Sequence, residues 1–205
     1  MKPSSVPRPD AAQRPGEVSR KSPALESSEL RIAISGKSGC GNTTVSRIVA
    51  EKLGLRVINY TFKNLARDSG MSFEELALKA ETDPQYDHTI DRMQVDLARM
   101  GGCVLGSRLA IWLLRDTALT VYLKAGLEVR ASRIARREGG DPSHVLSRTA
   151  VRDKRDHDRY QRLYGYDIDQ FDFATLIVDT DKLNQDEVAE VIVNFVRQKH
   201  DPGMK

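Results

Sequence analysis

Ile32-Ala33-Ile34-Ser35-Gly36-Lys37-Ser38-Gly39-Cys40-Gly41-Asn42-Thr43-Thr44-Val45 is the stretch that decides the fold. A short apolar run enters a loop with glycine at its first, fourth and sixth positions, and apolar residues at helical spacing follow at once. This order is typical of a phosphate-binding loop (P-loop), because glycines let backbone N–H groups turn inward and a helix N-terminus attracts anions. A glycine-rich turn without a ligand is the alternative.

The P-loop motif G-x-x-x-x-G-K-[ST] gives fixed roles to its last two positions. Thr43 stands where the hydroxyl reaches Mg²⁺, and Asn42 stands where the motif has lysine. An asparagine side chain donates hydrogen bonds but carries no charge. The loop therefore supports phosphate binding more firmly than it supports catalysis.

The composition is that of one globular domain. The chain has 205 residues, of which 40% are apolar and 30% charged, and its net charge of +3 does not indicate a dedicated nucleic-acid binder. Cys40 and Cys103 form no C-x-x-C pair, which favours free thiols in a reducing compartment. Cys40 as a nucleophile is a minor alternative, because no histidine is near it in sequence. The histidines also lack the i, i+4 pairing of a zinc site.

Residues 1–29 hold five of the eight prolines and show no apolar periodicity, which predicts a disordered tail. This segment also lacks the apolar region of a signal peptide. The longest strongly apolar run, Leu109 to Leu114, is too short to span a bilayer. We therefore expect a cytoplasmic protein with no membrane partner.

From residue 30 to residue 200, short β-rich runs alternate with helical patterns. This alternation predicts an α/β fold of the P-loop NTPase type, a five-stranded parallel sheet with helices on both faces. A last helix from about Gln185 to Gln198 is expected to close the sheet. The strands are expected at Arg31–Ser35, Arg56–Asn59, Cys103–Leu105, Leu119–Lys124 and Thr175–Asp179.

Four helix starts are predicted from their caps. Serine, aspartate and asparagine side chains accept hydrogen bonds from the free N–H groups of a first helical turn, and proline fits its first position. The predicted starts are two capping boxes, Ser72 with Glu75 and Asn184 with Glu187, and two N-caps followed by proline, Asp83-Pro84 and Asp141-Pro142.

Residues 60–101 lie between the second and third expected strands and show two or three helical patterns. A parallel crossover needs only one helix, so the excess predicts a substrate-binding cap over the sheet; a merely elaborated crossover is the alternative. Arg108 follows the third strand, beside the phosphate loop, where open α/β sheets bind ligands. Its planar guanidinium suits a phosphate, although a surface arginine is also compatible with this position.

The segment 130–162 is dense in arginine and holds a flexible joint at residues 138–142, where two glycines precede Asp141-Pro142. We expect arginines on two mobile helices to close over a polyphosphate and neutralise its charge. For any single arginine, a solvated and salt-bridged helix face is the alternative. The residues that share helix faces are Arg130, Arg133 and Arg137, and, further on, Arg152, Asp156 and Arg159.

Four motifs between about Arg31 and Val196 carry a family resemblance. They are Ile-Ser-Gly-x-x-Gly-x-Gly-x-Thr-Thr-Val (Ile34 to Val45), Ser107-Arg108-Leu109-Ala110-x-Trp112, Arg133-Ile134-Ala135-x-Arg137-Glu138, and Arg152-Asp153-x-Arg155-Asp156-x-x-Arg159-Tyr160 followed by Tyr164-Gly165-x-Asp167. Together they resemble the nucleoside monophosphate kinases, most closely the short cytidylate kinases of the archaeal type.

The resemblance implies that the protein transfers the γ-phosphoryl group of ATP to CMP or dCMP with Mg²⁺. Residues 60–101 would be the monophosphate-binding insertion, and 130–162 the mobile lid and its flanking helices. On the ATP side, the backbone from Gly36 to Thr44 would hold the phosphates, Thr43 would ligate Mg²⁺, and Arg133 and Arg137 would lie over the adenine and phosphates. On the CMP side, Arg108 would grip the phosphate with Arg152 and Arg159, Asp156 would orient the acceptor, and Lys63 would contact CMP.

Three positions depart from the family pattern. Asn42 replaces the loop lysine, Gly106-Ser107 stands where Glu-Gly is usual, and Lys63 stands where an arginine is expected. The first two departures remove a charged group from the implied site. Lys37 is a candidate to approach the phosphates in place of the missing lysine.

Two further functions compete with an active, monomeric ATP:CMP phosphotransferase. A nucleotide-binding sensor or interaction protein with weakened catalysis is favoured by Asn42 and Gly106. The enzyme is favoured by the acceptor-phosphate clamp of Arg108 and its partners, which a sensor of ATP alone does not need. Nucleic-acid binding is the weakest hypothesis, because acids interrupt the basic helix face and no aromatic platform accompanies it.

Overall fold

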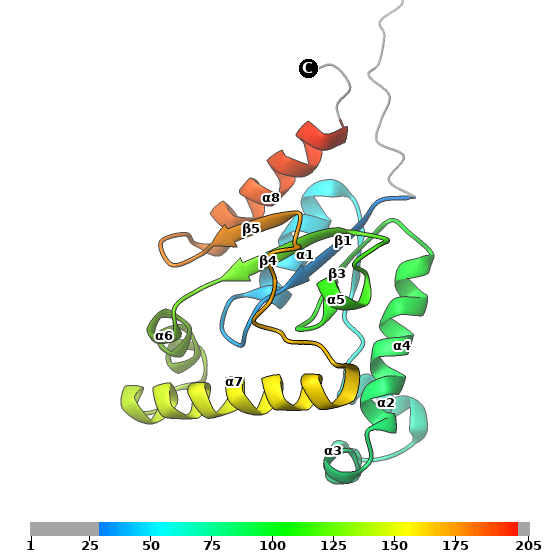
Figure 1. Ribbon diagram of the computed structural model, residues 1–205, viewed down its shortest axis with the longest axis vertical. Helices are drawn as coiled ribbons and strands as arrows, with labels where there is room; N and C mark the ends of the chain where they lie inside the picture. Colours follow the sequence, from blue (N-terminus) through cyan, green and yellow to red (C-terminus); the bar gives the residue numbers. More distant parts are fainter. Residues whose placement is uncertain (1–28, 201–205) are drawn as a thin grey trace, which may run out of the picture.

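The computed structural model describes residues 29–200, so the disordered tail predicted for residues 1–29 lies outside the described residues except for Glu29. A five-stranded sheet forms the centre, with strand order β2-β3-β1-β4-β5 and every pair parallel (Figure 1). The predicted sheet is confirmed, and three of its strands begin or end one residue from the expected position. The strands are β1 (Arg31–Ser35), β2 (Arg56–Ile58), β3 (Cys103–Gly106), β4 (Leu119–Lys124) and β5 (Leu176–Asp179).

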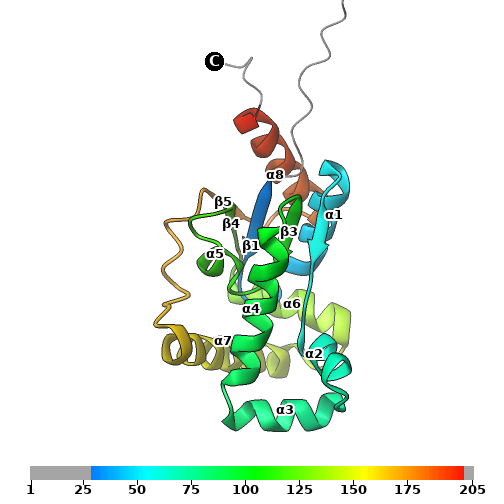
Figure 2. The same cartoon turned by 90° about the vertical axis from the view of Figure 1, so that its right-hand side faces the viewer.

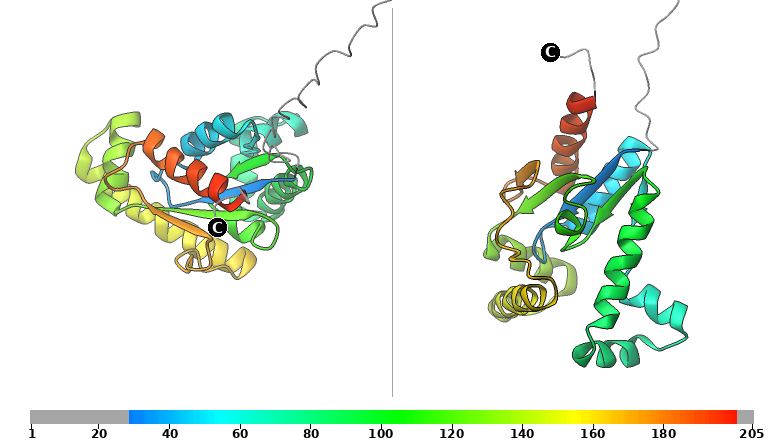
Figure 3. Two further views of the ribbon diagram at one scale, coloured as in Figure 1. Left: turned by 90° about the horizontal axis from the view of Figure 1, so that it is seen from above. Right: turned by 45° about the vertical axis from the view of Figure 1, so that its right-hand side comes forward.

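The central strand β1 is apolar on both faces, which explains its position between β3 and β4. Ile32 and Ile34 point to one face and Ala33 to the other, and all three are fully buried. Helices α1 (Asn42–Leu53) and α8 (Gln185–His200) pack on the isoleucine face, as Figure 3 shows from above. Helices α4 (Gln85–Arg99) and α5 (Ala110–Leu113) cover the other face. Burial on both faces contributes roughly 25 cal/mol for each Å² of apolar surface removed from water.

The segment between β2 and β3 forms three helices, α2 (Phe62–Ser69), α3 (Phe73–Thr82) and α4, in agreement with the two or three helices expected. Figure 2 shows α2 and α3 gathered at one end of α4, the end that also lies beside α7. The insertion is therefore attached to the sheet through α4 and extends past its edge.

Helices α6 (Leu127–Glu138) and α7 (Pro142–Tyr164) follow β4 and lie past the carboxyl ends of the strands (Figure 1). The predicted joint separates them: Gly139 and Gly140 have φ of +77° and +107°, a backbone region that favours glycine. A small apolar cluster of Ala131, Ile134 and Val145 holds the two helices together. Within residues 29–200, no helix has both the length and the apolar character needed to cross a bilayer.

Two of the four predicted caps form as expected. Asp141 accepts from the His144 N–H at 3.0 Å with proline in the first turn, and the Asn184 and Glu187 side chains make reciprocal bonds at 3.0 and 2.7 Å. The other two are corrections. Only half of the Ser72 box forms, because the Glu75 carboxylate pairs with Lys79 at 3.1 Å. Asp83 ends α3, and α4 begins one residue late at Gln85, because Asp83 accepts the Gln85 N–H at 2.9 Å and leaves Pro84 in the turn.

Candidate functional site

The predicted phosphate loop, residues 36–41, joins the end of β1 to the first turn of α1 at the carboxyl edge of the sheet. Gly39 and Gly41 have φ of +90° and +100°, values that other residues rarely adopt. Gly36 has no room for a side chain, because a Cβ there would lie 2.5 Å from the carbonyl oxygen of Leu123. The conformation of the loop therefore explains each of its three glycines.

Asn42 begins α1 and closes the loop on itself. Its side-chain amide donates a hydrogen bond to the Gly36 carbonyl oxygen at 2.6 Å. Its side-chain oxygen is buried and has no hydrogen-bond partner within residues 29–200. Where the P-loop motif has a charged lysine, this chain therefore has an uncharged side chain that fastens the loop.

A cavity of about 850 Å³ opens beside the loop. The free N–H groups at the start of α1 add partial positive charge there. Because basic side chains outnumber acidic ones on its wall, the cavity suits an anionic ligand such as a polyphosphate. The basic residues are Lys37, Arg108, Arg133, Arg136, Arg137 and Arg152, and the acidic ones are Glu138 and Asp186.

Arg108 lies just past β3, where Ser35 fixes the backbone. The Ser35 hydroxyl donates to the Ser107 carbonyl oxygen at 2.9 Å and accepts from the Ile111 N–H at 3.1 Å. The Arg108 guanidinium forms an ion pair with the nearly buried Asp156 carboxylate of α7 at 3.1 Å. This pair joins α7 to the sheet edge and holds the guanidinium at the cavity wall. Asp156 itself does not line the cavity, so the contacts of both residues with CMP stay predictions.

Arg152 also lines the cavity, one helical turn before Asp156. It forms no ion pair among the residues that the structure describes. Partial burial and the nearby Arg108 guanidinium lower the pKa of Arg152 from its usual value. Two like charges at one wall repel each other unless an anion lies between them.

Arg133 and Arg137 of α6 both line the cavity, as their shared helix face predicts. Arg133 is anchored to the turn before α8, because it donates to the Thr180 hydroxyl at 3.0 Å and to the Thr180 carbonyl oxygen at 2.5 Å. Arg137 is exposed and pairs with its neighbour Glu138 at 2.5 Å. Arg137 is therefore free to move toward a ligand, whereas Arg133 is held.

Arg159 does not line this cavity. Its guanidinium instead forms an ion pair with Asp87 of α4, which joins α7 to the insertion. Beside that pair, Tyr164 donates a hydrogen bond to Asp91, and burial raises the pKa of Asp91 to about 6. Lys63 is exposed on α2 and does not line the cavity either, so its contact with CMP stays a prediction.

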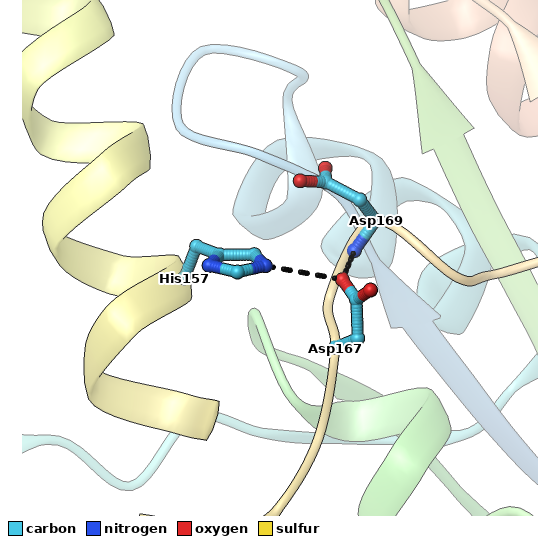
Figure 4. A group of neighbouring side chains, drawn as sticks. All are labelled: His157, Asp167 and Asp169. Atoms are coloured by element: carbon cyan, nitrogen blue, oxygen red, sulfur yellow. Dashed lines mark hydrogen bonds and ion pairs between the residues drawn. The ribbon is translucent and has the colours of Figure 1, made fainter. Parts of the chain in front are cut away.

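Lys37 is tied to α7 through the segment that follows this helix. Its ammonium forms an ion pair with Asp169 at 2.6 Å. The Asp169 N–H donates to Asp167 at 2.9 Å, and the same Asp167 oxygen lies 3.2 Å from His157 Nε2 on α7 (Figure 4). These last three side chains are spaced closely enough to hold a metal ion, but the Lys37 ammonium already neutralises Asp169. Lys37 also lines the cavity, and its contact with a phosphate stays a prediction.

Ser46 of α1 explains the glycine at position 106. A Cβ on Gly106 would lie 2.8 Å from the Ser46 Cβ and still closer to its hydroxyl. A glutamate at position 106 is therefore excluded by the packing of α1. The hydroxyls of Ser46 and Ser107 are buried here without hydrogen-bond partners in the described part of the chain.

The surroundings of Cys40 are unfavourable for a nucleophile. Its side chain is only 4% exposed, and burial raises the pKa of the thiol to about 11. A thiol that stays protonated at neutral pH is a poor nucleophile. Burial and the raised pKa therefore disfavour the alternative role of Cys40 in covalent chemistry.

Three residues of this region, Asp87, Arg136 and Thr180, are not predicted by the sequence motifs. Arg136 lines the cavity and lies within the arginine-dense segment 130–162, so the composition of that segment could have indicated it. Asp87 and Thr180 had no such signal, because they meet Arg159 and Arg133 across 72 and 47 positions of the chain.

Comparisons with known proteins agree with this geometry. The model of the cytidylate kinase-like family matches residues 31–182. The chain belongs to this family. A protein named cytidylate kinase 2 from Borreliella burgdorferi is 46% identical over 175 residues, which cover 83% of this chain and 97% of the relative. A cytidylate kinase from Archaeoglobus fulgidus is 39% identical over 173 residues, which cover 83% of this chain and 96% of the relative.

Among solved structures, a shikimate kinase from Acinetobacter baumannii in complex with shikimate has a TM-score of 0.58 at 19% identity, and the match covers 87% of this chain and 99% of that one. This likeness shows the shared fold alone. Membership of the cytidylate kinase-like family confirms the resemblance and makes the protein a kinase, an enzyme of the transferase class. The sensor alternative is not favoured.

Proposed function

We propose that the protein transfers the γ-phosphoryl group of ATP to CMP or dCMP and so forms CDP or dCDP. The observation that carries the proposal is that the phosphate loop and Arg108 line the same cavity. Arg108 is held there by its ion pair with Asp156. Relatives named cytidylate kinase support CMP as the acceptor class. A place in pyrimidine nucleotide metabolism follows from this substrate.

On the ATP side, the loop and the start of α1 offer backbone N–H groups to the phosphates. Arg137, exposed at the cavity wall, is the side chain best able to turn toward the ATP, and Arg133 supplies a fixed charge. Asn42 shapes the loop without adding charge. These arginines thus supply the charge that the loop lacks.

On the acceptor side, Arg108 and Arg152 lie together on the cavity wall, where an acceptor phosphate would relieve their repulsion. Asp156 orients Arg108, and the ion pair of Arg159 with Asp87 orders the neighbouring side of α7. A phosphate monoester is mostly ionised at pH 7, since its second pKa is about 6, so no general base is needed. Positioning and charge neutralisation accomplish the reaction.

The residues present fit a nucleotide-bound Mg²⁺. Thr43 is the second residue of α1 and lines the cavity. Ser107 lines the same cavity, and its buried hydroxyl has no hydrogen-bond partner in residues 29–200. Hydroxyl, phosphate and water oxygens are ligands that Mg²⁺ accepts. When bound, the ion would reduce the negative charge of the ATP phosphates, and Thr43 and Ser107 would help to hold it.

The same proposal assigns roles to the two helical units outside the sheet. Residues 60–101 form the monophosphate-binding insertion, supported by the contact of Asp87 with Arg159. Residues 130–162 form the lid and its flanking helices, supported by the two glycines between α6 and α7. A cytoplasmic location and a monomeric state stay predictions, and two free, buried cysteines support the first.

A coupled assay of ADP release tests the proposal. Wild-type protein with Mg-ATP is compared across CMP, dCMP, UMP, AMP and GMP. We expect turnover with CMP or dCMP, and Arg108→Ala to lower kcat/KM by about 10³-fold because the acceptor phosphate loses its main cation. Arg99→Ala, an exposed arginine paired with Asp96 at 2.8 Å, is the matched control and should leave kcat/KM unchanged.

Asn42→Lys separates the two functions that the sequence left open. In an active enzyme we expect this variant to be no faster than wild type, because it loses the bond from Asn42 to the Gly36 carbonyl oxygen. Wild-type protein that binds ATP but turns over none of the five monophosphates contradicts the proposal and supports the sensor. Activity gained by Asn42→Lys would then place the loss in the phosphate loop.

A further inference from the structure

Arg130 is a buried arginine directly behind the phosphate loop. Only 4% of its surface is exposed. Its guanidinium donates to the Ser38 carbonyl oxygen of the loop at 3.1 Å and to the Ala125 carbonyl oxygen at 3.2 Å. The remaining N–H groups make a two-pronged ion pair with Asp153 of α7, at 3.1 and 2.6 Å. One guanidinium therefore contacts the loop, the end of β4 and α7 together.

This arrangement leaves the outer turn of the loop little freedom. The backbone of Arg130 packs against Gly39, where a Cβ would lie 2.8 Å from the Arg130 carbonyl oxygen and 3.1 Å from its Cα. With the Ser38 carbonyl held by the guanidinium, the neighbouring peptides cannot rotate without breaking a buried, charge-assisted hydrogen bond. The loop and the first turn of α6 thus form one rigid unit.

Asp153 transmits this rigidity to the substrate-facing side of α7. It directly follows Arg152 and precedes Asp156 by three residues, and all three belong to the same helix. Fixing Asp153 against Arg130 fixes the rotation of α7, because a helix turns about 100° with each residue. Arg152 then faces the cavity and Asp156 reaches Arg108.

The ion pair of Arg130 with Asp153 is not part of a solvated, salt-bridged helix face. Asp153 is also largely buried, with 13% of its side chain accessible. A buried ion pair contributes little net stability, since desolvation of two charges offsets their attraction. A role in geometry is the better reason for its presence.

We infer that Arg130 and Asp153 are positioning residues whose ion pair fixes the orientation of α7 relative to the phosphate loop. ATP binding at the loop and the placement of the acceptor-side arginines on α7 then depend on each other. Neither residue lines the cavity beside the phosphate loop. The inference rests on the proposed function. It adds Arg130, which lies outside the four motifs, and gives a role to Asp153, a motif residue to which the resemblance assigned none.

The experiment compares Asp153→Asn, Arg130→Lys and the double variant with wild type. Affinity for a non-hydrolysable ATP analogue is measured by titration calorimetry, and kcat and KM for CMP are measured by the coupled assay. We expect each single variant to bind the analogue about tenfold more weakly, the effect of losing a hydrogen bond to a charged group. We expect kcat to fall by about 10²-fold through misplacement of the reacting groups. The double variant should lose little more than either single one.

Two controls separate positioning from stability. Lys154→Ala removes an exposed ion pair with Asp158 on the same helix, and it should change neither affinity nor kcat. Val193→Ala opens the buried core under α8 at a residue that does not line the cavity, so it lowers the unfolding temperature and should leave analogue affinity unchanged. If Asp153→Asn does not fold, Asp153→Glu, which keeps the charge and displaces it, replaces it.

The inference is overturned if the folded variants keep analogue affinity and kcat within twofold of wild type and only their unfolding temperature is lowered. Additive losses in the double variant overturn it as well. Failure of the proposed function is seen separately, because wild-type protein would then bind the analogue but turn over no monophosphate. The affinity series of the variants still tests the ion pair in that case.

Discussion

The arginines around the loop cavity and α7 fall into two groups that differ in their partners. Arg130, Arg108 and Arg159 each form an ion pair with an aspartate, namely Asp153, Asp156 and Asp87. Arg136 and Arg152 line the cavity and form no ion pair among the described residues. The paired arginines connect elements of the fold, whereas the unpaired ones leave positive charge uncompensated. The difference separates arginines that connect elements of the fold from arginines whose charge has no acidic partner among the described residues, and Arg108 both connects elements and lines the cavity.

Breaking this comparison begins with Arg152→Ala and Arg159→Ala, which we expect to lower kcat/KM by about 10²-fold or more. Their effects on the free energy of unfolding without nucleotide should differ. Arg152→Ala removes repulsion with Arg108 and should leave stability equal or slightly higher. Arg159→Ala leaves the nearly buried Asp87 carboxylate unpaired and should cost about 1–3 kcal/mol.

Urea unfolding of the two variants and wild type measures this difference. Saturating CMP should then raise the stability of wild type more than that of Arg152→Ala. Equal destabilisation by both substitutions would show that Arg152 is structural and would remove the distinction between paired and unpaired arginines.

The same distinction marks what the sequence could predict. The strand β1, the glycine loop and the start of α1 are contiguous, so local patterns placed them correctly, and β4 was predicted to the residue. Arg108 and Arg152 could be placed near the loop because topology brings strand ends and the following helices to one edge. The partners of the paired arginines could not be predicted. Arg159 and Asp87 are 72 positions apart, and Arg130 and Asp153 are 23 apart on different helices, and no periodicity relates them.

Gly106 extends the comparison of charges to packing. The glutamate that is usual at this position in the family is absent here, because Ser46 leaves no room for a side chain. We expect Gly106→Ala to lower the free energy of unfolding by about 1–3 kcal/mol, since its Cβ would overlap Ser46. Ser46→Gly should recover part of this loss in the double variant, although a glycine within α1 itself costs about 1 kcal/mol. Gly126→Ala is the control, because a Cβ there meets its nearest atom at an ordinary 3.5 Å. Equal losses in the single and the double variant, measured by urea unfolding, would mean that Ser46 is not the obstacle.

Asp91 is the reverse of Arg152, an acid whose partner is the neutral hydroxyl of Tyr164. Burial raises the pKa of Asp91 from 3.8 to about 6, so the folded protein favours the protonated acid. Its contribution to stability is present below about pH 4 and is lost as the pH rises through 6. For this half-buried group we expect a loss of about 1–2 kcal/mol.

Asp91→Asn keeps a side chain that accepts the Tyr164 hydroxyl and removes the titration. The stability of this variant relative to wild type should therefore grow between pH 4 and pH 7 and then level off. Urea unfolding at several pH values checks this, in a His88→Asn background, because the His88 ring packs edge-on against Tyr164 at 5.0 Å. Parallel pH profiles for the two proteins would contradict the assignment. They would mean that the Asp91 carboxylate stays ionised in the folded protein, stabilised by the cation of Arg159 that its neighbour Asp87 already shares.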